Sequence, residues 1–101
     1  MSRTGDIADA AEGIVAGTLD PLTGIRRIVD SVGPAWDRDD DLVAIVEIHS
    51  VTDHYPGLPQ RELWDPTALA ELDVERDAYF AEAAPGLLEV CRRLAARRDE
   101  A

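Results

Sequence analysis

The residues best suited to chemistry lie in one stretch, Glu47–Pro66, which reads EIHSVTDHYPGLPQRELWDP. It contains the two histidines of the chain, His49 and His54, with Asp53 between them. If this part of the chain is helical, His49 and Asp53 lie on one side, and their imidazole and carboxylate groups are ligands that zinc accepts. In a hydrolytic enzyme, His49 or His54 could be the general base, and Asp53 could orient it. The stretch therefore holds candidates for a metal site or a hydrolytic site.

Both chemical interpretations are incomplete. A metal site needs a third or fourth ligand, and the spacing of the histidines matches no zinc-hydrolase motif. Ser50 or Thr52 would be the nucleophile of a hydrolase, but no nucleophile elbow or glycine-rich oxyanion turn accompanies them. Thr52 and Asp53 are typical of a helix end, where such side chains bind backbone groups. We therefore expect no cofactor and no catalytic residue, and an enzyme using His49, Asp53 and His54 is the alternative.

Arg61 is the one cation of the stretch and lies among carboxylates. We expect it to form an ion pair with Asp53, Glu47 or Asp73. The expected role is structural, because such a pair ties the loop at residues 53–65 to the helices on either side of it.

Trp64 is the second residue that this loop sets apart. Together with Tyr55 and Leu58, it predicts either a hydrophobic plug that fastens the loop or an anchor for a partner protein, and we favour the plug. The candidate functional loop comprises the residues Glu47, His49, Asp53, His54, Arg61 and Trp64.

The sequence around the loop predicts an all-α fold in a single domain, residues 1–101. Periodic apolar residues and capping signals predict a compact bundle of helices at about 4–16, 21–32, 39–52, 66–84 and 86–98, with an ordered proline-rich loop at 53–65. The clearest helix starts are the pairs Asp20-Pro21 and Asp65-Pro66. In each pair the aspartate is a favoured cap and the proline is tolerated at the first helical position.

Two segments allow more than one interpretation. Pro85 and Gly86 predict either a kink or a break near Ala83, which gives a bundle of four or five helices. Residues 42–49, LVAIVEIH, fit a strand by their β-branched content and a helix by the spacing of their apolar residues. We favour a helix, because no other segment is a convincing partner strand and a lone strand leaves its backbone groups unpaired.

A run of aspartates precedes this segment. Asp37, Asp39 and Asp41 have the spacing of a calcium loop, but Leu42 stands where that loop needs glycine and Ile48 where it needs a bidentate glutamate. We interpret the run as the acidic start of a helix, where carboxylates lie near unpaired backbone N–H groups.

Composition restricts the classes of partner. The chain has 101 residues, of which 21 are acidic and 10 basic, so its net charge is −11. This charge argues against binding to nucleic-acid backbones or to anionic membranes, because both depend on lysine and arginine. It favours solubility and permits a basic protein partner.

Three further features concern the setting of the protein. Its one cysteine, Cys91, is placed on an apolar helix face and is expected to be a buried structural thiol, and a single cysteine excludes an intramolecular disulfide. The sequence has no apolar run of membrane-spanning length and no signal peptide, so we expect a cytoplasmic location. Every basic residue is arginine and alanine is abundant, which suggests a bacterial origin.

One motif in the candidate loop resembles that of a known group of proteins. The pattern T-D-H-x-P-x4-R-x-x-W is formed by Thr52, Asp53, His54, Pro56, Arg61 and Trp64. It is followed by L-x3-D-x-E at Leu69, Asp73 and Glu75, and preceded by Pro21, Gly24, Arg26 and Ile28 in a matching order. These patterns resemble a family of small uncharacterised bacterial proteins over most of residues 14–76. That family usually has glycine at the position of Leu58, so the loop turn differs here. The resemblance implies a fold unit and a candidate functional loop, and it implies no particular chemistry.

The sequence therefore predicts a small acidic protein-binding module that masks a basic partner, as immunity proteins and antitoxins do. One alternative is the metal-dependent or hydrolytic enzyme described above. Another is a structural subunit that forms a homodimer through an exposed Trp36 or Trp64.

Overall fold

A computed structural model describes residues 3–56 and 58–97 of the chain. Its helices are α1 (Arg3–Ala16), α2 (Pro21–Ser31), the short 3₁₀ helix η1 (Trp36–Arg38), α3 (Asp40–Thr52), α4 (Leu58–Arg61) and α5 (Pro66–Ala96). The predicted all-α bundle is confirmed, since the described residues contain no strand and residues 42–49 are helical. Within the same residues, no helix is long and apolar enough to cross a membrane.

Two helices begin where the sequence marks them most clearly. The carboxylate of Asp20 accepts a hydrogen bond from the backbone N–H of Thr23 at the start of α2, at an N···O distance of 3.1 Å. Asp65 accepts the equivalent bond from Ala68 at the start of α5, also at 3.1 Å. In both helices a proline follows the cap, where its missing N–H leaves no bond unmade.

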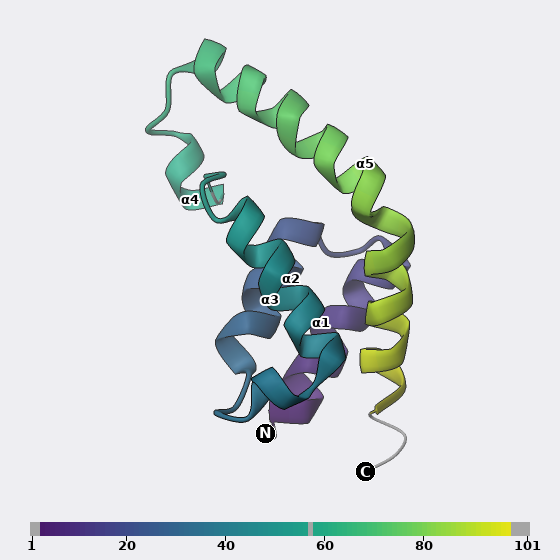
Figure 1. Ribbon diagram of the computed structural model, residues 1–101. Coiled ribbons are helices and arrows are strands. Elements are labelled where there is room, and N and C mark those ends of the chain that lie inside the picture. The colour runs from purple at the N-terminus through teal and green to yellow at the C-terminus, as the bar shows by residue number, and fades with distance from the viewer. Residues whose placement is uncertain (1–2, 57, 98–101) are drawn as a thin grey trace.

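The four longer helices enclose a single core. Helix α1 packs against α2 and α5, and α3 packs against the same two helices (Figure 1). The side chains buried between them are Ile7, Ala10, Ala11, Ile14, Ile25, Ile28, Leu42, Ile45, Leu87, Val90, Cys91 and Leu94. Cys91 is a free thiol in this core, and burial raises its pKa to about 11, which confirms the prediction of a buried structural cysteine.

The acidic run forms the start of α3 and is bound by the end of α5. Asp39 is the helix cap, and its Oδ1 accepts hydrogen bonds from the backbone N–H groups of Asp41 and Leu42 at 3.1 and 3.4 Å. The guanidinium of Arg97 donates to both carboxylate oxygens of Asp39 and to Asp41. These contacts lower the pKa of Asp39, chiefly through the hydrogen bonds from Arg97. The predicted acidic helix start is confirmed, except that Asp37 belongs to η1.

Helix α5 continues through Pro85 for a total of 31 residues. Of the predicted alternatives, a kink and a break, the kink is observed: Figure 1 shows α5 changing direction where its colour passes from green to yellow-green. The helices expected at 66–84 and 86–98 are thus one helix, with residue 98 outside the described part. Pro85 and Ala81 are both exposed, so water can bind the carbonyl that the proline leaves unpaired.

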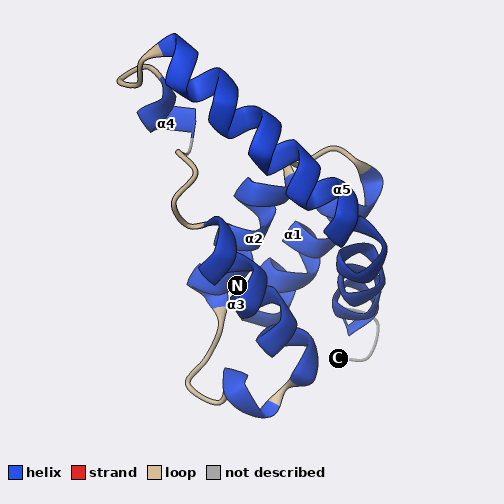
Figure 2. Ribbon diagram, turned by 45° about the horizontal axis from the view of Figure 1, so that its top comes forward, coloured by secondary structure: helices blue, strands red, loops and turns tan. Residues whose placement is uncertain are grey.

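The kink divides α5 into two different halves. Its fully buried residues, Leu87, Val90, Cys91 and Leu94, all lie in the second half. The first half has none, and both ribbon views show it extending away from α1, α2 and α3, with α4 close to its start (Figures 1 and 2). The first half of α5 therefore has few neighbours in the described structure: Phe80 near the kink packs against the core, and the 53–65 loop lies beside the start of the helix.

The role of Asp39 as the cap of α3 predicts a difference between two substitutions. Asp39→Asn keeps a good helix cap and removes the charge, whereas Asp39→Ala removes both. We therefore expect Asp39→Ala to be less stable than Asp39→Asn by about 1 kcal/mol in urea denaturation at neutral pH.

The ion pair of Asp39 and Arg97 makes a prediction for acid conditions. Because the pKa of Asp39 is lowered in the folded protein, its carboxylate stabilises the fold above the ordinary pKa of 3.8, and this contribution is lost as the pH falls through the folded pKa. The stability advantage of the natural protein over Asp39→Asn should shrink in urea titrations below pH 3.8. An advantage that stays constant there would contradict the ion pair.

Candidate functional site

The path of the 53–65 loop is fixed by Tyr55, which is 4% exposed. Its hydroxyl donates a hydrogen bond to Glu75 Oε1 on α5 at 3.1 Å, and its backbone carbonyl accepts one from Arg26 on α2. Burial and the carboxylate of Glu75 raise the pKa of Tyr55, so the hydroxyl keeps the proton that it donates. The plug favoured at Trp64 is thus Tyr55, while Trp64 remains 40% exposed. The expected contribution of Leu58 lies outside the described side chains.

Arg61 forms the second tie between the loop and α5. Its two terminal nitrogens each donate to one carboxylate oxygen of Asp73, both at 2.7 Å. Asp73 is one of the three partners expected from the sequence. The paired hydrogen bonds raise the pKa of Arg61 and lower that of Asp73, so both groups stay charged at neutral pH.

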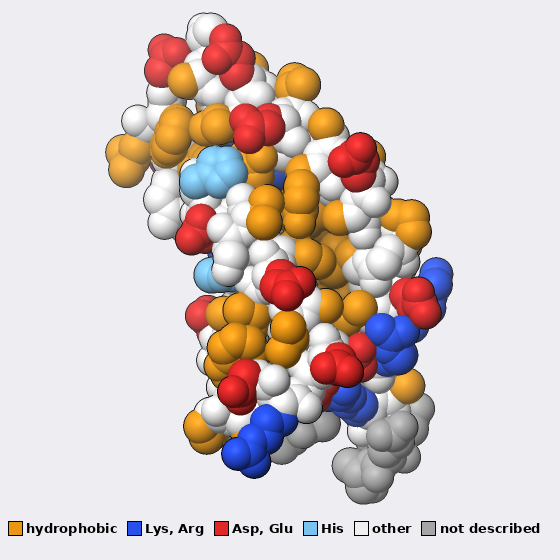
Figure 3. Space-filling view, viewed as in Figure 1, with side chains coloured by type: hydrophobic (Ala, Val, Ile, Leu, Met, Phe, Trp, Pro, Cys, Tyr) orange, Lys and Arg blue, Asp and Glu red, His pale blue; other side chains and the backbone are white. Residues whose placement is uncertain are grey.

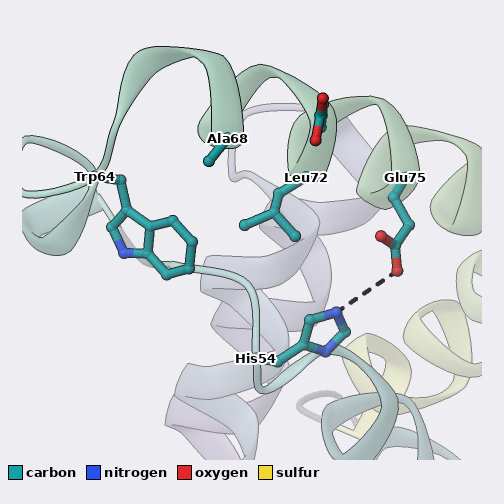
Figure 4. A pocket seen from close by; sticks show the side chains of 6 residues that line it. His54, Trp64, Ala68, Leu72 and Glu75 are labelled. Carbon is teal, nitrogen blue, oxygen red and sulfur yellow. Dashed lines mark ion pairs between the residues drawn. The ribbon is translucent and has the colours of Figure 1, made fainter.

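An open hollow of about 410 Å³ lies between the loop and the first half of α5. The residues lining this hollow, called the Trp64 hollow below, are His54, Trp64, Ala68, Glu71, Leu72 and Glu75. Figure 4 shows the indole of Trp64 on one side, His54 and Glu75 on the other, and Ala68 and Leu72 between them on α5. The hollow thus combines an aromatic wall, an aliphatic floor and two carboxylates.

His54 closes the hollow on the side away from Trp64. Its imidazole lies against the ring of Tyr55, with the two ring centroids 4.0 Å apart. Its Nε2 lies 3.7 Å from Glu75 Oε1, and the side chain is 50% exposed. This separation is longer than a hydrogen bond, so Glu75 is held by the hydroxyl of Tyr55 more than by His54.

The carboxylates of the hollow form no ion pair with the arginine of the loop or with that of the first half of α5. Arg61 and Arg76 both form ion pairs with Asp73, and Arg76 also contacts Asp77 at 3.3 Å. Glu71 forms no hydrogen bond or ion pair with any other residue that the structure describes. The hollow therefore keeps a negative charge that the neighbouring cations leave unpaired.

Three other predicted site residues do not line the hollow. Glu47 and Asp53 are exposed and His49 is half-buried, and their side chains form no hydrogen bond or ion pair within residues 3–56 and 58–97. Over the same ranges, no group of three or more histidine, cysteine, aspartate or glutamate side chains has the arrangement of a metal site. His49, Asp53 and His54 thus do not complete a ligand set in the described structure.

The two proposed nucleophiles bind their own helix. The hydroxyl of Thr52 is buried and donates to the carbonyl of Ile48 at 2.8 Å, and that of Ser50 donates to the carbonyl of Val46 at 3.1 Å. The expected helix-end role is therefore observed for Thr52. It is not observed for Asp53, whose side chain binds no backbone group within the described residues.

The contribution of α5 to the hollow was missed from the sequence. Ala68 and Leu72 are four residues apart, as are Glu71 and Glu75. This spacing places the four side chains on neighbouring positions of one helix face. An apolar pair interleaved with an acidic pair, directly after Trp64, is the signal that could have identified this face.

The tie between Arg61 and Asp73 predicts the behaviour of the loop. Arg61→Ala should increase the rate of amide hydrogen exchange severalfold over residues 53–65, because the loop loses its bidentate contact with α5. Arg92→Ala is the matched control, since Arg92 is exposed and makes no described contact. Mass spectrometry of exchanged peptides measures both variants. Equal exchange in the loop of the two variants would contradict a structural role for the pair.

Comparison with known proteins gives no match for this chain. No protein-family model matches the chain, and searches of curated proteins and of solved structures give no significant match either. The resemblance of the loop motif to a bacterial family therefore stays a prediction.

Proposed function

We propose that this protein is a small acidic protein-binding module that masks a basic partner, in the manner of an immunity protein or an antitoxin. The observation that carries the proposal is the Trp64 hollow, where an exposed indole lies beside Glu71 and Glu75, two carboxylates that form no ion pair with an arginine of the described structure. The proposed setting is the bacterial cytoplasm, as expected from the sequence, and the proposed partner is a protein rather than a nucleic acid.

The distribution of charge supports a basic partner. The chain has 21 acidic residues and 10 arginines, and several of these arginines are used within the fold. The arginines that bind carboxylates or backbone carbonyls are Arg26, Arg61, Arg76, Arg93 and Arg97. These arginines thus form contacts within the protein, while many carboxylates face solvent. A surface of this kind steers cationic partners and repels anionic ones.

Exposed apolar side chains support binding at the same end of the molecule. Leu63 is 87% exposed, Trp64 40% and Val74 72%, and all three lie in the loop or in the first half of α5. Figure 3 shows hydrophobic side chains gathered over α4 and the start of α5 beside a histidine, with acidic side chains along α5. Tryptophan at such a position is the residue type that most often contributes strongly to protein interfaces.

The two alternatives gain less support. A site for a metal-dependent or hydrolytic enzyme would need His49, Asp53 and His54 together, and the described residues do not bring a ligand set together. Trp36, the other residue considered for a homodimer, packs against the core.

A homodimer through Trp64 would bring two chains of charge −11 together at an acidic hollow. We therefore expect the protein to be a monomer in light scattering at high micromolar concentration, at low salt, where this repulsion is least screened. A stable dimer that Trp64→Ala dissociates would instead support the structural-subunit alternative.

Binding to a basic partner can be tested by affinity capture. The protein is immobilised on a support and incubated at low salt with an extract of its source organism. An unrelated protein of similar size and net charge is treated in the same way as a control. We expect this protein alone to retain a basic protein, which high salt then releases because screening weakens the charge contacts. The retained protein is identified, purified and shown to bind with one-to-one stoichiometry. Retention of the same basic proteins by both baits would contradict the proposal.

A further inference from the structure

We propose that the Trp64 hollow receives an arginine side chain of the partner, with the guanidinium stacked on the indole of Trp64 and bound to Glu71 and Glu75. This inference rests on the proposed function and names the group that is recognised.

The shape of the hollow suits a side chain that is partly apolar. Its walls are the indole of Trp64 and the imidazole of His54, and Leu72 lies between them (Figure 4). The aliphatic stem of an arginine can lie along Leu72 while its planar head faces the indole. The volume of about 410 Å³ lies within the range of about 300–1,000 Å³ typical of ligand pockets, so residues beside the arginine can also enter.

The charge of the hollow suits a cation that donates several hydrogen bonds. Glu71 and Glu75 are one helical turn apart on α5, so both carboxylates can reach one guanidinium. Glu71 has both oxygens available, and the described contacts of Glu75 with Tyr55 and His54 use only its Oε1. A guanidinium has five N–H donors, which is enough to bind both carboxylates at once.

Arginine fits this arrangement better than lysine. A guanidinium is planar, more weakly hydrated than an ammonium group, and stacks on aromatic rings. Tryptophan is the aromatic side chain that attracts cations most strongly. Lysine would place a compact, strongly hydrated charge against the indole and would offer fewer donors to the two carboxylates.

The cation that enters the hollow comes from another molecule. Arg61 in the loop and Arg76 in the first half of α5 are both held by Asp73. Moving Arg61 to Glu71 would break the bidentate pair that holds the loop and would disturb the wall formed by Trp64. Within the described structure the fold thus directs its own cations away from the site.

A defined peptide tests the site on the full chain. The probe is a blocked tripeptide with a central arginine between two leucines, titrated into isotopically labelled protein and followed by the indole N–H signal of Trp64 in nuclear magnetic resonance spectra. Matched peptides carry lysine or the uncharged arginine analogue citrulline at the centre. We expect the arginine peptide to bind about tenfold more tightly than the citrulline peptide, because a hydrogen-bonded charge is lost. Equal affinity for the arginine and citrulline peptides would overturn the proposal.

Two pairs of variants locate the binding. Glu71→Gln should weaken binding of the arginine peptide severalfold, whereas Glu82→Gln, at an exposed position on the same helix, should not change it. Trp64→Ala should abolish the saturable shifts of amides around the hollow, whereas Val51→Ala, at an exposed apolar position on α3 that does not line the hollow, should retain them. Binding that is indifferent to both Glu71→Gln and Trp64→Ala would overturn the assignment to this hollow.

The partner obtained by affinity capture separates this inference from the proposed function. A basic partner that binds Glu71→Gln and Trp64→Ala as tightly as the natural protein would support the proposed function and overturn the arginine site. Specific binding of the arginine peptide without any basic partner would support the site and count against the masking function.

Discussion

Pro85 has no backbone N–H to donate to the carbonyl of Ala81, and α5 changes direction in this region. Because both residues are exposed, water can bind the unpaired carbonyl and the helix continues through the proline. The second half of α5 then packs Leu87 and Leu94 into the core, while the first half extends beyond the bundle. The kink thus separates the part of α5 that stabilises the fold from the part that forms the Trp64 hollow.

A half-helix without fully buried side chains depends on its cap and on its neighbours, because tertiary packing supplies most helical stability in proteins. Here the neighbours are the core, which Phe80 contacts, and the 53–65 loop. Tyr55 joins three elements, since its carbonyl binds Arg26 on α2 and its hydroxyl binds Glu75 on α5. Arg61 adds a bidentate contact with Asp73 two residues earlier on α5. The loop predicted to be ordered is therefore also what positions the first half of α5.

The sequence identifies features that depend on one helical turn and leaves open those that depend on the path of the chain. The cap at Asp65 could be predicted because the aspartate, the following proline and the backbone N–H that it binds are all local. From the sequence, the possible partners of Arg61 could only be reduced to three carboxylates. Identifying Asp73 among them requires knowing the direction in which α5 runs. For the same reason hydrophobicity alone did not show that Tyr55 is buried and Trp64 exposed, because both are large aromatic residues in one loop.

The charge of the hollow is a consequence of the contacts that hold the fold. Arg61 and Arg76 are bound to Asp73, and Glu71 forms no ion pair within the described residues. Trp64 remains at the surface because Tyr55 occupies the buried position. In the isolated chain this arrangement is unfavourable, because an apolar ring stays in water and carboxylates lie close together in a protein of net charge −11. When a cationic side chain with an apolar stem enters the hollow, the apolar ring is covered and the repulsion between the carboxylates is relieved, so both contributions become favourable. The local cost to the free protein is therefore the source of the free energy with which it would bind a basic partner.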